Sequence, residues 1–406
     1  YPFRVLVEQG VGSFMVAHLS VPALDAREKR PTTLSRPVIS DLLRNTLGFE
    51  GLIFTDAMEM KGVTKYYAPG EADVEALRAG NDMVLLPESI EAAIAAVKKA
   101  LTEGSLSALE IETSVRRVLH QKYRLGLTRP QMVDMKNLRQ ELNTPQALVL
   151  KRRLIENCLT LVRDDKKIVG CAGLENRRYA TLGIGDSNLT VFQKSCALYA
   201  GVRHYNLGKV FTAERELQII DSVRQSDVLL VSLHNMRSKA SDNFGLTDQQ
   251  INFIRRLCDV TSVGLTVFGN PYSLRYFDDI PTVLEAYSED PFIQEISAQA
   301  WFGARDLVGK LPVTASKNAQ YGQGIQKKWT AHRMRYDLPE SVGMSSDTLR
   351  QLDSLMRVLI NTGAAPGAQI CIVKDNCVVW NKAYGYHTYD QTRPVDIQDL
   401  YDVASV

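Results

Sequence analysis

Gly51-Leu52-Ile53-Phe54-Thr55-Asp56 is the stretch that decides the fold of the first part of the chain. Its run of successive apolar residues, bounded by Gly51, is typical of a strand buried on both faces of a parallel sheet. Helix and strand patterns alternate on both sides of it: a strand over 11–18, a helix over 37–47, a helix over 71–79, a strand over 82–87 and a helix over 91–101. This order predicts a parallel sheet or part of a (β/α) barrel.

The number of these units limits the fold. A closed (β/α)8 barrel needs eight strand–helix units and about 250 residues, whereas residues 1–130 hold three such units. The sequence therefore predicts either a small open sheet or the C-terminal part of a barrel. The chain opens on Tyr1 without an initiator Met or a signal peptide, and its last residues begin a new helical pattern. We therefore expect a fragment that is truncated at both ends.

A second α/β region is expected over residues 147–320, after a linker at 128–146. Four apolar runs predict its strands, at 159–162, 179–184, 228–232 and 263–268. Helical patterns at 248–257 and 291–302 favour an open sheet that is covered by helices on both faces. Gly183-Ile184-Gly185 follows a strand but lacks the third glycine and the acidic residue of a dinucleotide site, so no cofactor is expected.

A third region is expected over residues 337–406, after an irregular, polar stretch at 309–335 that is typical of a second linker. Ser345 can cap a helix that runs to Leu359. The apolar runs 368–373 and 377–380 around Lys374-Asp375-Asn376 predict a β-hairpin.

Composition excludes several classes of function. The 48 basic and 46 acidic residues leave a net charge of +2, which argues against a nucleic-acid partner. No apolar run is long enough to span a membrane. The six cysteines are too sparse for a disulfide framework and contain no Cys-x-x-Cys pair, so no metal site is expected.

Asp56 is the first candidate catalytic residue. It ends a predicted strand, and in parallel α/β folds the active sites gather where the carboxyl ends of the strands meet solvent. A carboxylate there can attack an anomeric carbon and form a covalent glycosyl-enzyme. The structural alternatives are an aspartate that caps the next helix or one that pairs with a lysine.

His18 and Met58 are candidate substrate-binding residues near the same sheet edge. His18 follows a strand and would lie at the same end of the sheet as Asp56, or else be hydrogen-bonded into the rim. Met58 is a core residue or an apolar platform for a sugar. Glu59 is too close to Asp56 in the chain for us to assign it as the acid/base. The other histidines, including His234, show no metal-ligand spacing and are expected to be packing or surface residues.

The segments that carry a family resemblance follow one another in order: 15–19 (MVAHL), 22–25 (PALD), 33–35 (TLS), 47–60 (LGFEGLIFTDAMEM), 76–82 (ALRAGND) and 114–119 (SVRRVL). They resemble family 3 glycoside hydrolases, and the form Thr-Asp-Ala-x-x-Met at residues 55–60 is nearer to the β-N-acetylhexosaminidase branch. The resemblance implies that residues 1–130 are the C-terminal part of the glycoside hydrolase TIM barrel. It also implies that Asp56 is the nucleophile.

The family's Lys-His-Phe-Pro segment and its Asp-x-His acid/base pair do not occur in the 406 residues. The resemblance places both of them upstream of Tyr1, so we expect the chain as written to be inactive. Residues 147–320 resemble the family's α/β sandwich domain. Residues 337–406 resemble the start of a β-lactamase-like serine hydrolase, in which Ser405 would be the nucleophile if a lysine followed three residues later.

The main hypothesis is therefore a retaining glycosidase that removes terminal β-N-acetylglucosamine from glycans or muropeptides. By resemblance, we expect it in peptidoglycan turnover, in the periplasm or on a lipid anchor of a Gram-negative bacterium. Two alternatives remain open. One is acyl transfer by the C-terminal serine hydrolase, and the other is a non-catalytic carbohydrate-binding scaffold.

Overall fold

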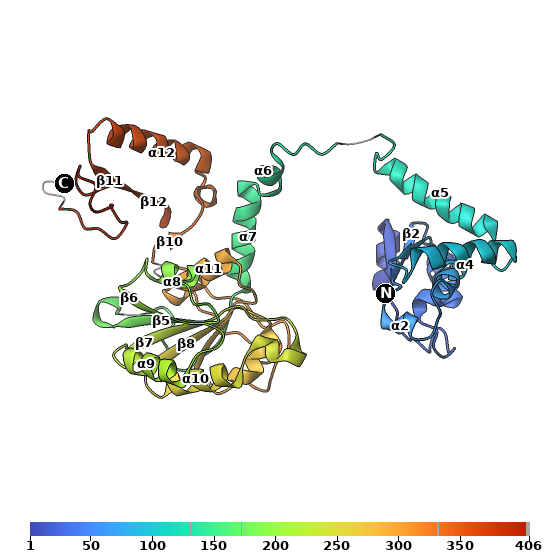
Figure 1. Ribbon diagram of the computed structural model, residues 1–406, viewed down its shortest axis with the longest axis horizontal. Coiled ribbons are helices and arrows are strands. Elements are labelled where there is room, and N and C mark those ends of the chain that lie inside the picture. The colour runs from blue at the N-terminus through green and yellow to red at the C-terminus, as the bar shows by residue number, and fades with distance from the viewer. Residues whose placement is uncertain (130–131, 172, 331–332, 403–406) are drawn as a thin grey trace. The chain divides into compact units, whose positions relative to one another are not determined.

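The computed structural model describes residues 1–129, 132–171, 173–330 and 333–402. The chain forms two compact units, Tyr1–Met135 and Lys136–Val406 (Figure 1). The boundary between them falls inside the predicted first linker. The finer division of the second unit at residues 320–337 stays a prediction. No helix among the described residues is long and apolar enough to cross a membrane.

The first unit contains a three-stranded parallel sheet in the order β1-β2-β3. Its strands and helices alternate as the sequence predicts. The elements are α1 (Pro2–Glu8), β1 (Ser13–Val16), η1 (Thr32–Leu34), η2 (Pro37–Thr46), β2 (Leu52–Ala57), α2 (Lys61–Thr64), α3 (Glu71–Ala79), β3 (Met83–Leu85), α4 (Ile90–Thr102) and α5 (Ala108–Arg124). Gly80 ends α3 with φ +110°, and a Cβ atom there would lie 2.6 Å from the Ser40 hydroxyl oxygen, so the position requires glycine.

A buried carboxylate fixes the start of β2. The Asp82 side chain is fully buried and pairs with Arg44 at 2.5 Å and with Arg117 at 3.0 Å. The same carboxylate accepts a hydrogen bond from the Ile53 backbone N–H at 2.9 Å. Burial lowers the pKa of Arg44, and the charge of Asp82 opposes that shift. Asp82 thus ties η2, α5 and β2 together, and β2 is the strand that carries Asp56.

The second unit is built on a six-stranded sheet in the order β4-β9-β8-β7-β5-β6, in which β4 is antiparallel and all other pairs are parallel. Its strands are β4 (Thr160–Asp164), β5 (Tyr179–Ile184), β6 (Val202–Leu207), β7 (Val228–Leu233), β8 (Ser262–Val267) and β9 (Thr282–Glu285). Its helices are α6 (Leu138–Leu142), α7 (Pro145–Cys158), η3 (Leu174–Asn176), α8 (Val191–Cys196), α9 (Ala213–Val223), η4 (Ala240–Gly245), α10 (Asp248–Cys258), η5 (Pro271–Phe277) and α11 (Pro291–Trp301).

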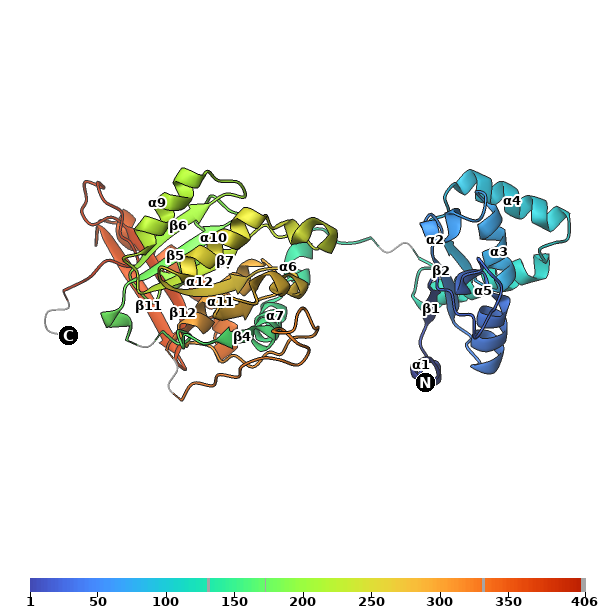
Figure 2. The ribbon, with the colours of Figure 1, turned by 90° about the horizontal axis from the view of Figure 1, so that it is seen from below.

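Two cores flank this sheet and confirm the prediction of helices on both faces. On β7, Leu229 and Val231 join a core with α9 and α10. The alternate residues Val228 and Leu230 join a second core with α7, α8 and α11. The alternation follows from the strand geometry, in which successive side chains point to opposite faces. The two helical layers lie on opposite sides of the sheet (Figures 1 and 2).

The stretch 309–335 corrects one sequence-based expectation. Its residues 309–330 are irregular, as predicted, but they pack along strand β4 of the same unit rather than acting as a linker. The Gly309 N–H donates to the Leu159 carbonyl at 3.2 Å, and the Ile325 N–H donates to the Leu161 carbonyl at 2.7 Å. Lys327 pairs with Asp164, and Leu311 is only 1% exposed. The segment thereby satisfies backbone groups at the outer edge of β4, which would otherwise be an open strand edge.

The C-terminal segment confirms the predicted helix and hairpin. It contains β10 (Arg335–Tyr336), η6 (Pro339–Val342), α12 (Ser346–Asn361), β11 (Gly367–Lys374) and β12 (Cys377–Gly385). Strands β11 and β12 are antiparallel, and the two turn residues Asp375 and Asn376 have φ of 51° and 56°. Positive φ at both central residues is what a two-residue type I′ hairpin turn requires. Ser405 lies outside the described residues.

Candidate functional site

Asp56 is the second-to-last residue of strand β2, at the carboxyl edge of the parallel sheet. The side chain is half-buried, and its Oδ1 accepts a hydrogen bond from the Ala57 N–H at 2.8 Å. The following helix, α2, has Met60 at its N-cap and no side-chain cap. Among the described residues no lysine, arginine or histidine forms an ion pair with Asp56. The structure therefore gives this carboxylate neither of the two structural roles that the sequence left open.

His18 lies beside the backbone that follows Asp56. Its Nε2 is 3.0 Å from the Ala57 carbonyl oxygen, and its Nδ1 is 2.9 Å from the Thr33 hydroxyl oxygen. A carbonyl oxygen only accepts, so Nε2 carries the hydrogen. The structure thus places His18 and Asp56 at the same sheet edge, as the sequence predicts. It also gives the imidazole a role in the rim, because the ring holds the Ala57 peptide in place.

A buried polar network beneath His18 was not predicted from the sequence. The Thr33 hydroxyl lies 2.8 Å from the Ala17 carbonyl oxygen. The Asn81 side-chain amide donates to the carbonyl oxygens of Thr33 and Ala76, at 2.9 and 2.7 Å. Thr33 and Asn81 are almost fully buried. Their signal in the sequence is weak, because each lies beside another polar residue, and the pattern does not reveal which distant groups they bind.

Met58 lies in the core rather than on an open surface. Its side chain is 2% exposed and belongs to a cluster with Leu34 and Val63. Of the two roles that the sequence allowed, Met58 has that of a core residue, because its side chain leaves almost no surface for a ligand to contact. Glu59 is exposed and follows directly after it.

Another acidic side chain of the first unit, that of Asp25, already has other partners. Asp25 accepts hydrogen bonds from Arg27 Nε at 2.8 Å and from the Ser35 hydroxyl at 2.6 Å. The hydrogen bonds from Arg27, which outweigh the effect of burial, hold the pKa of Asp25 well below its usual range. A carboxyl group with such a low pKa stays ionised and cannot donate a proton near neutral pH. Asp25 is therefore not the general acid.

A second chain of polar side chains lies in the other unit, where β7 ends. His234 Nε2 is 2.9 Å from the Ser232 hydroxyl oxygen, and His234 Nδ1 is 3.0 Å from Glu289 Oε1. The order Ser–His–Glu is that of a hydrolase triad. However, Ser232 is 0% exposed, so no substrate can reach its hydroxyl in this structure. His234 is thus a buried, hydrogen-bonded packing residue, as the sequence favoured.

Comparison with known proteins shows that the first unit is similar to a glycosidase family. Residues 1–121 match the model of the glycosyl hydrolase family 3 N terminal domain. A β-hexosaminidase A from Pseudoalteromonas piscicida is 26% identical over 273 residues, which is 61% of this chain and 44% of that protein. A β-hexosaminidase from Chromobacterium violaceum is 38% identical over 99 residues, or 24% of this chain and 27% of that protein. The chain thus spans less than half the length of these two relatives.

Solved structures extend the similarity into the second unit. A family 3 β-N-acetylglucosaminidase from Paenibacillus sp. matches with a TM-score of 0.63 and 25% sequence identity. The match covers 78% of this chain and 60% of that protein. The similarity to glycosyl hydrolase family 3 thus covers residues 1–121 by the family model, and the proteins that match this chain include β-hexosaminidases.

Proposed function

We propose that the protein containing this chain is a retaining exo-β-N-acetylhexosaminidase and that Asp56 is its nucleophile. The observation that carries the proposal is the position of Asp56. It is a half-buried carboxylate at the carboxyl edge of a parallel sheet, its one hydrogen bond is local, and it pairs with no cation among the described residues. The names of the relatives support a β-N-acetylhexosaminide as the substrate.

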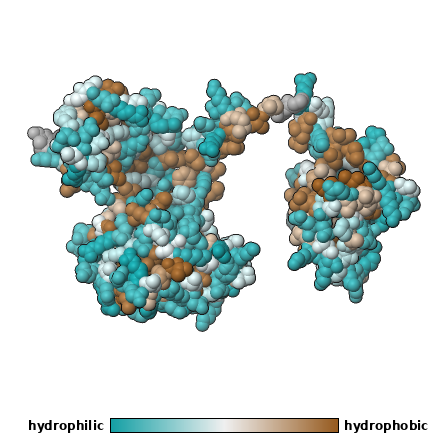
Figure 3. Space-filling model, in the orientation of Figure 1, coloured by the Kyte–Doolittle hydropathy of each residue, from teal (hydrophilic) through white to brown (hydrophobic). Residues whose placement is uncertain are grey.

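The proposal includes a barrel of which β1, β2 and β3 are three strands. The region beside β1 supports this part, because an apolar groove of about 280 Å³ opens there, lined by residues that include Phe3, Met15, Leu19 and Leu24. These four side chains are each at least 45% exposed. Apolar surface gathers on this unit in the space-filling view (Figure 3). Further strands of a barrel would cover such a groove.

The chemistry follows from a two-step displacement. Asp56 attacks C1 of the terminal sugar, while a general acid protonates the leaving oxygen; water then breaks the glycosyl–Asp56 ester, and the same group now acts as base. By its resemblance to family 3, the protein takes this acid/base group from an Asp-x-His pair that is not in the sequence. His18 acts as a positioning residue, because its bond to the Ala57 carbonyl orients the backbone next to Asp56.

The experiment is the exchange Asp56→Asn in the protein as its organism produces it. It is assayed on p-nitrophenyl β-N-acetylglucosaminide and on the corresponding β-glucoside. Asparagine has nearly the same shape but cannot form the ester, so kcat should fall by at least about 10³-fold. Asp41→Asn is the matched control, since Asp41 is an exposed aspartate on η2. Rates near those of the unmodified protein in the Asp56→Asn variant would end the assignment.

The serine-hydrolase alternative stays a prediction, because Ser405 lies outside the described residues. It requires acylation of the natural protein by a labelled penicillin. The scaffold alternative requires binding of N-acetylglucosamine without hydrolysis. No observation in the structure favours either over the glycosidase.

A further inference from the structure

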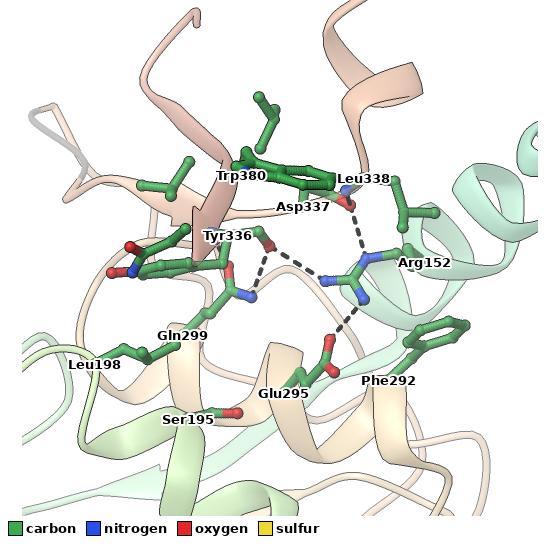
Figure 4. Close-up of a pocket in the computed structure, with 13 residues that line it drawn as sticks. Arg152, Ser195, Leu198, Phe292, Glu295, Gln299, Tyr336, Asp337, Leu338 and Trp380 are labelled. Carbon is green, nitrogen blue, oxygen red and sulfur yellow. Dashed lines mark hydrogen bonds and ion pairs between the residues drawn. The ribbon is translucent and has the colours of Figure 1, made fainter. Parts of the chain in front are cut away.

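A second pocket, of about 330 Å³, lies in the Lys136–Val406 unit, far along the chain from Asp56. Helices α7, α8 and α11 of the sheet domain form one side of it, and residues of β10, of β12 and of the segment just before η6 form the other. We call it the seam pocket (Figure 4). Its volume is at the lower end of the range for small-molecule sites, which is roughly 300–1,000 Å³.

Ion pairs hold the walls of the seam pocket in place. Arg152 is 3% exposed. It lies 2.7 Å from Asp337, 2.7 Å from Glu295 and 3.2 Å from the Tyr336 carbonyl oxygen. Because these acceptors already surround its guanidinium, Arg152 has little capacity left for a ligand anion. The two carboxylates outnumber the one cation of the lining, which also disfavours a phosphate or carboxylate ligand.

Other polar groups of the lining remain available. Within the described parts of the chain, the Asn381 side-chain amide makes no hydrogen bond, so it can both donate and accept. Glu295 Oε2 accepts a hydrogen bond from Arg152 Nη1. The Glu295 side chain is 35% exposed, so its Oε1 can accept from a ligand hydroxyl. The aromatic rings of Trp380 and Phe292 complete the lining, and Trp380 lies across the pocket from Ser195 and Glu295 (Figure 4).

The geometry points to a binding site for one uncharged sugar ring in the seam pocket. A pyranose has an apolar face of C–H groups and a rim of hydroxyls. The partly exposed ring of Phe292 suits the apolar face, since Trp380 is only 9% exposed, and Glu295 and Asn381 suit the hydroxyls. The pocket volume accommodates one such ring. The inference goes beyond the proposed function, because it rests on no property of Asp56 and names a site in the other unit.

The site has a consequence for stability. A sugar in the seam pocket touches both α11 and β12, so it binds only when the C-terminal hairpin is docked on the helices. Any ligand that binds only the docked state raises the population of that state. The bound sugar would therefore protect the backbone amides of β12 from hydrogen exchange.

The experiment titrates N-acetylglucosamine, glucose and inorganic phosphate separately into the full chain and follows the indole N–H signals by two-dimensional NMR. The chain has three tryptophans, and a Trp380→Phe variant assigns the signal of interest. The unmodified chain serves for the titration, because N-acetylglucosamine and glucose carry no glycosidic bond that a glycosidase could hydrolyse.

We expect a saturable shift of the Trp380 signal with a sugar and none with phosphate. Asn381→Ala and Glu295→Gln should each raise the dissociation constant of the sugar about tenfold, which corresponds to the loss of one hydrogen bond. In the Glu295→Gln variant the side-chain carbonyl oxygen remains an acceptor for Arg152, so that variant should remain folded. The matched controls are Asn361→Ala and Glu175→Gln, both at exposed positions outside the pocket, and they should leave the constant unchanged.

Three outcomes would overturn the inference. The first is an unshifted Trp380 signal with both sugars up to about 50 mM, since that concentration would detect even millimolar affinity. The second is a shift that Asn381→Ala and Glu295→Gln leave unaffected, because the sugar would then bind elsewhere. The third is tighter binding of phosphate than of either sugar. None of these outcomes bears on Asp56, so the proposed function can fail or survive separately.

Discussion

Replacing Asp337 by asparagine should loosen the C-terminal segment from the sheet domain. The Asp337 side chain is 7% exposed and lies 2.7 Å from Arg152 Nε and 2.6 Å from Arg305 Nη2. Both arginine side chains are only 4% exposed. Asp337→Asn keeps the shape but removes the charge, which leaves two buried guanidinium groups with less compensation. Removing one partner of a buried ion pair costs about 3–5 kcal/mol.

The assay is urea unfolding of the full chain, followed by tryptophan fluorescence. All three tryptophans, Trp301, Trp329 and Trp380, lie in the second unit, so the signal does not report on the first. With a denaturant slope of about 3 kcal/mol/M, a loss of about 3–5 kcal/mol lowers the midpoint by about 1–1.7 M. The control is Asp347→Asn, because the Asp347–Arg350 pair is exposed and such pairs contribute about 0–1 kcal/mol.

The effect should also depend on pH. Burial alone would raise the pKa of Asp337, but the charges of Arg305 and Arg152 and the hydrogen bonds outweigh it and hold the pKa below its ordinary value. A carboxylate with a lowered pKa contributes stability above its unfolded-state pKa of about 3.9, and that stability is lost as the pH falls through the folded-state pKa. The difference between the unmodified chain and Asp337→Asn should thus be full at pH 7 and shrink below about pH 3.9. A midpoint change at pH 7 no larger than that of Asp347→Asn would refute the reasoning.

The remaining predictions concern the buried ion pairs of Asp82 with Arg44 and Arg117 and the reactivity of the cysteines. Asp82→Asn should destabilise the first unit by about 3–5 kcal/mol, because Arg44 then loses its buried counter-charge. Hydrogen exchange at the Ile53 amide should become faster, since that N–H donates to Asp82. An unchanged exchange rate in the variant would contradict this prediction. Cys371 is exposed, whereas burial raises the pKa of Cys171 to about 12, so iodoacetamide at pH 8 should label Cys371 and spare Cys171 until the chain is unfolded. Equal labelling rates for the two thiols would show that Cys171 is accessible.

The elements that the sequence predicted are those whose local pattern carries the whole signal. Strands β5, β7 and β8 are buried on both faces and therefore appear as continuous apolar runs. Helix α10 was predicted within one residue, because its apolar face repeats with the helical period and Thr247 caps it. Strand β6 was missed, since it lies at the sheet edge and alternates polar residues, and β9 was missed because it has only four residues.

Features that depend on distant partners could not be predicted in the same way. The packing of residues 309–330 rests on backbone hydrogen bonds at the edge of β4, which leave no periodic pattern in the side chains. At the candidate site, the position of Asp56 at a strand end followed from the sequence. The hydrogen bonds that join Thr33 to His18 and Asn81 to Thr33 did not, because they link residues 15 and 48 positions apart.

The most direct test of the central claim is to trap the glycosyl-enzyme and find the residue that carries it. The protein as its organism produces it is treated with a fluorinated N-acetylglucosaminyl fluoride, which forms the intermediate faster than water releases it. Trypsin digestion and mass spectrometry then locate the sugar. The account predicts an adduct on the peptide that spans residues 45–61, with fragmentation placing it on Asp56, and no adduct in the Asp56→Asn variant. A sugar attached to another carboxylate, such as Glu50 or Glu59 of the same peptide, would contradict it.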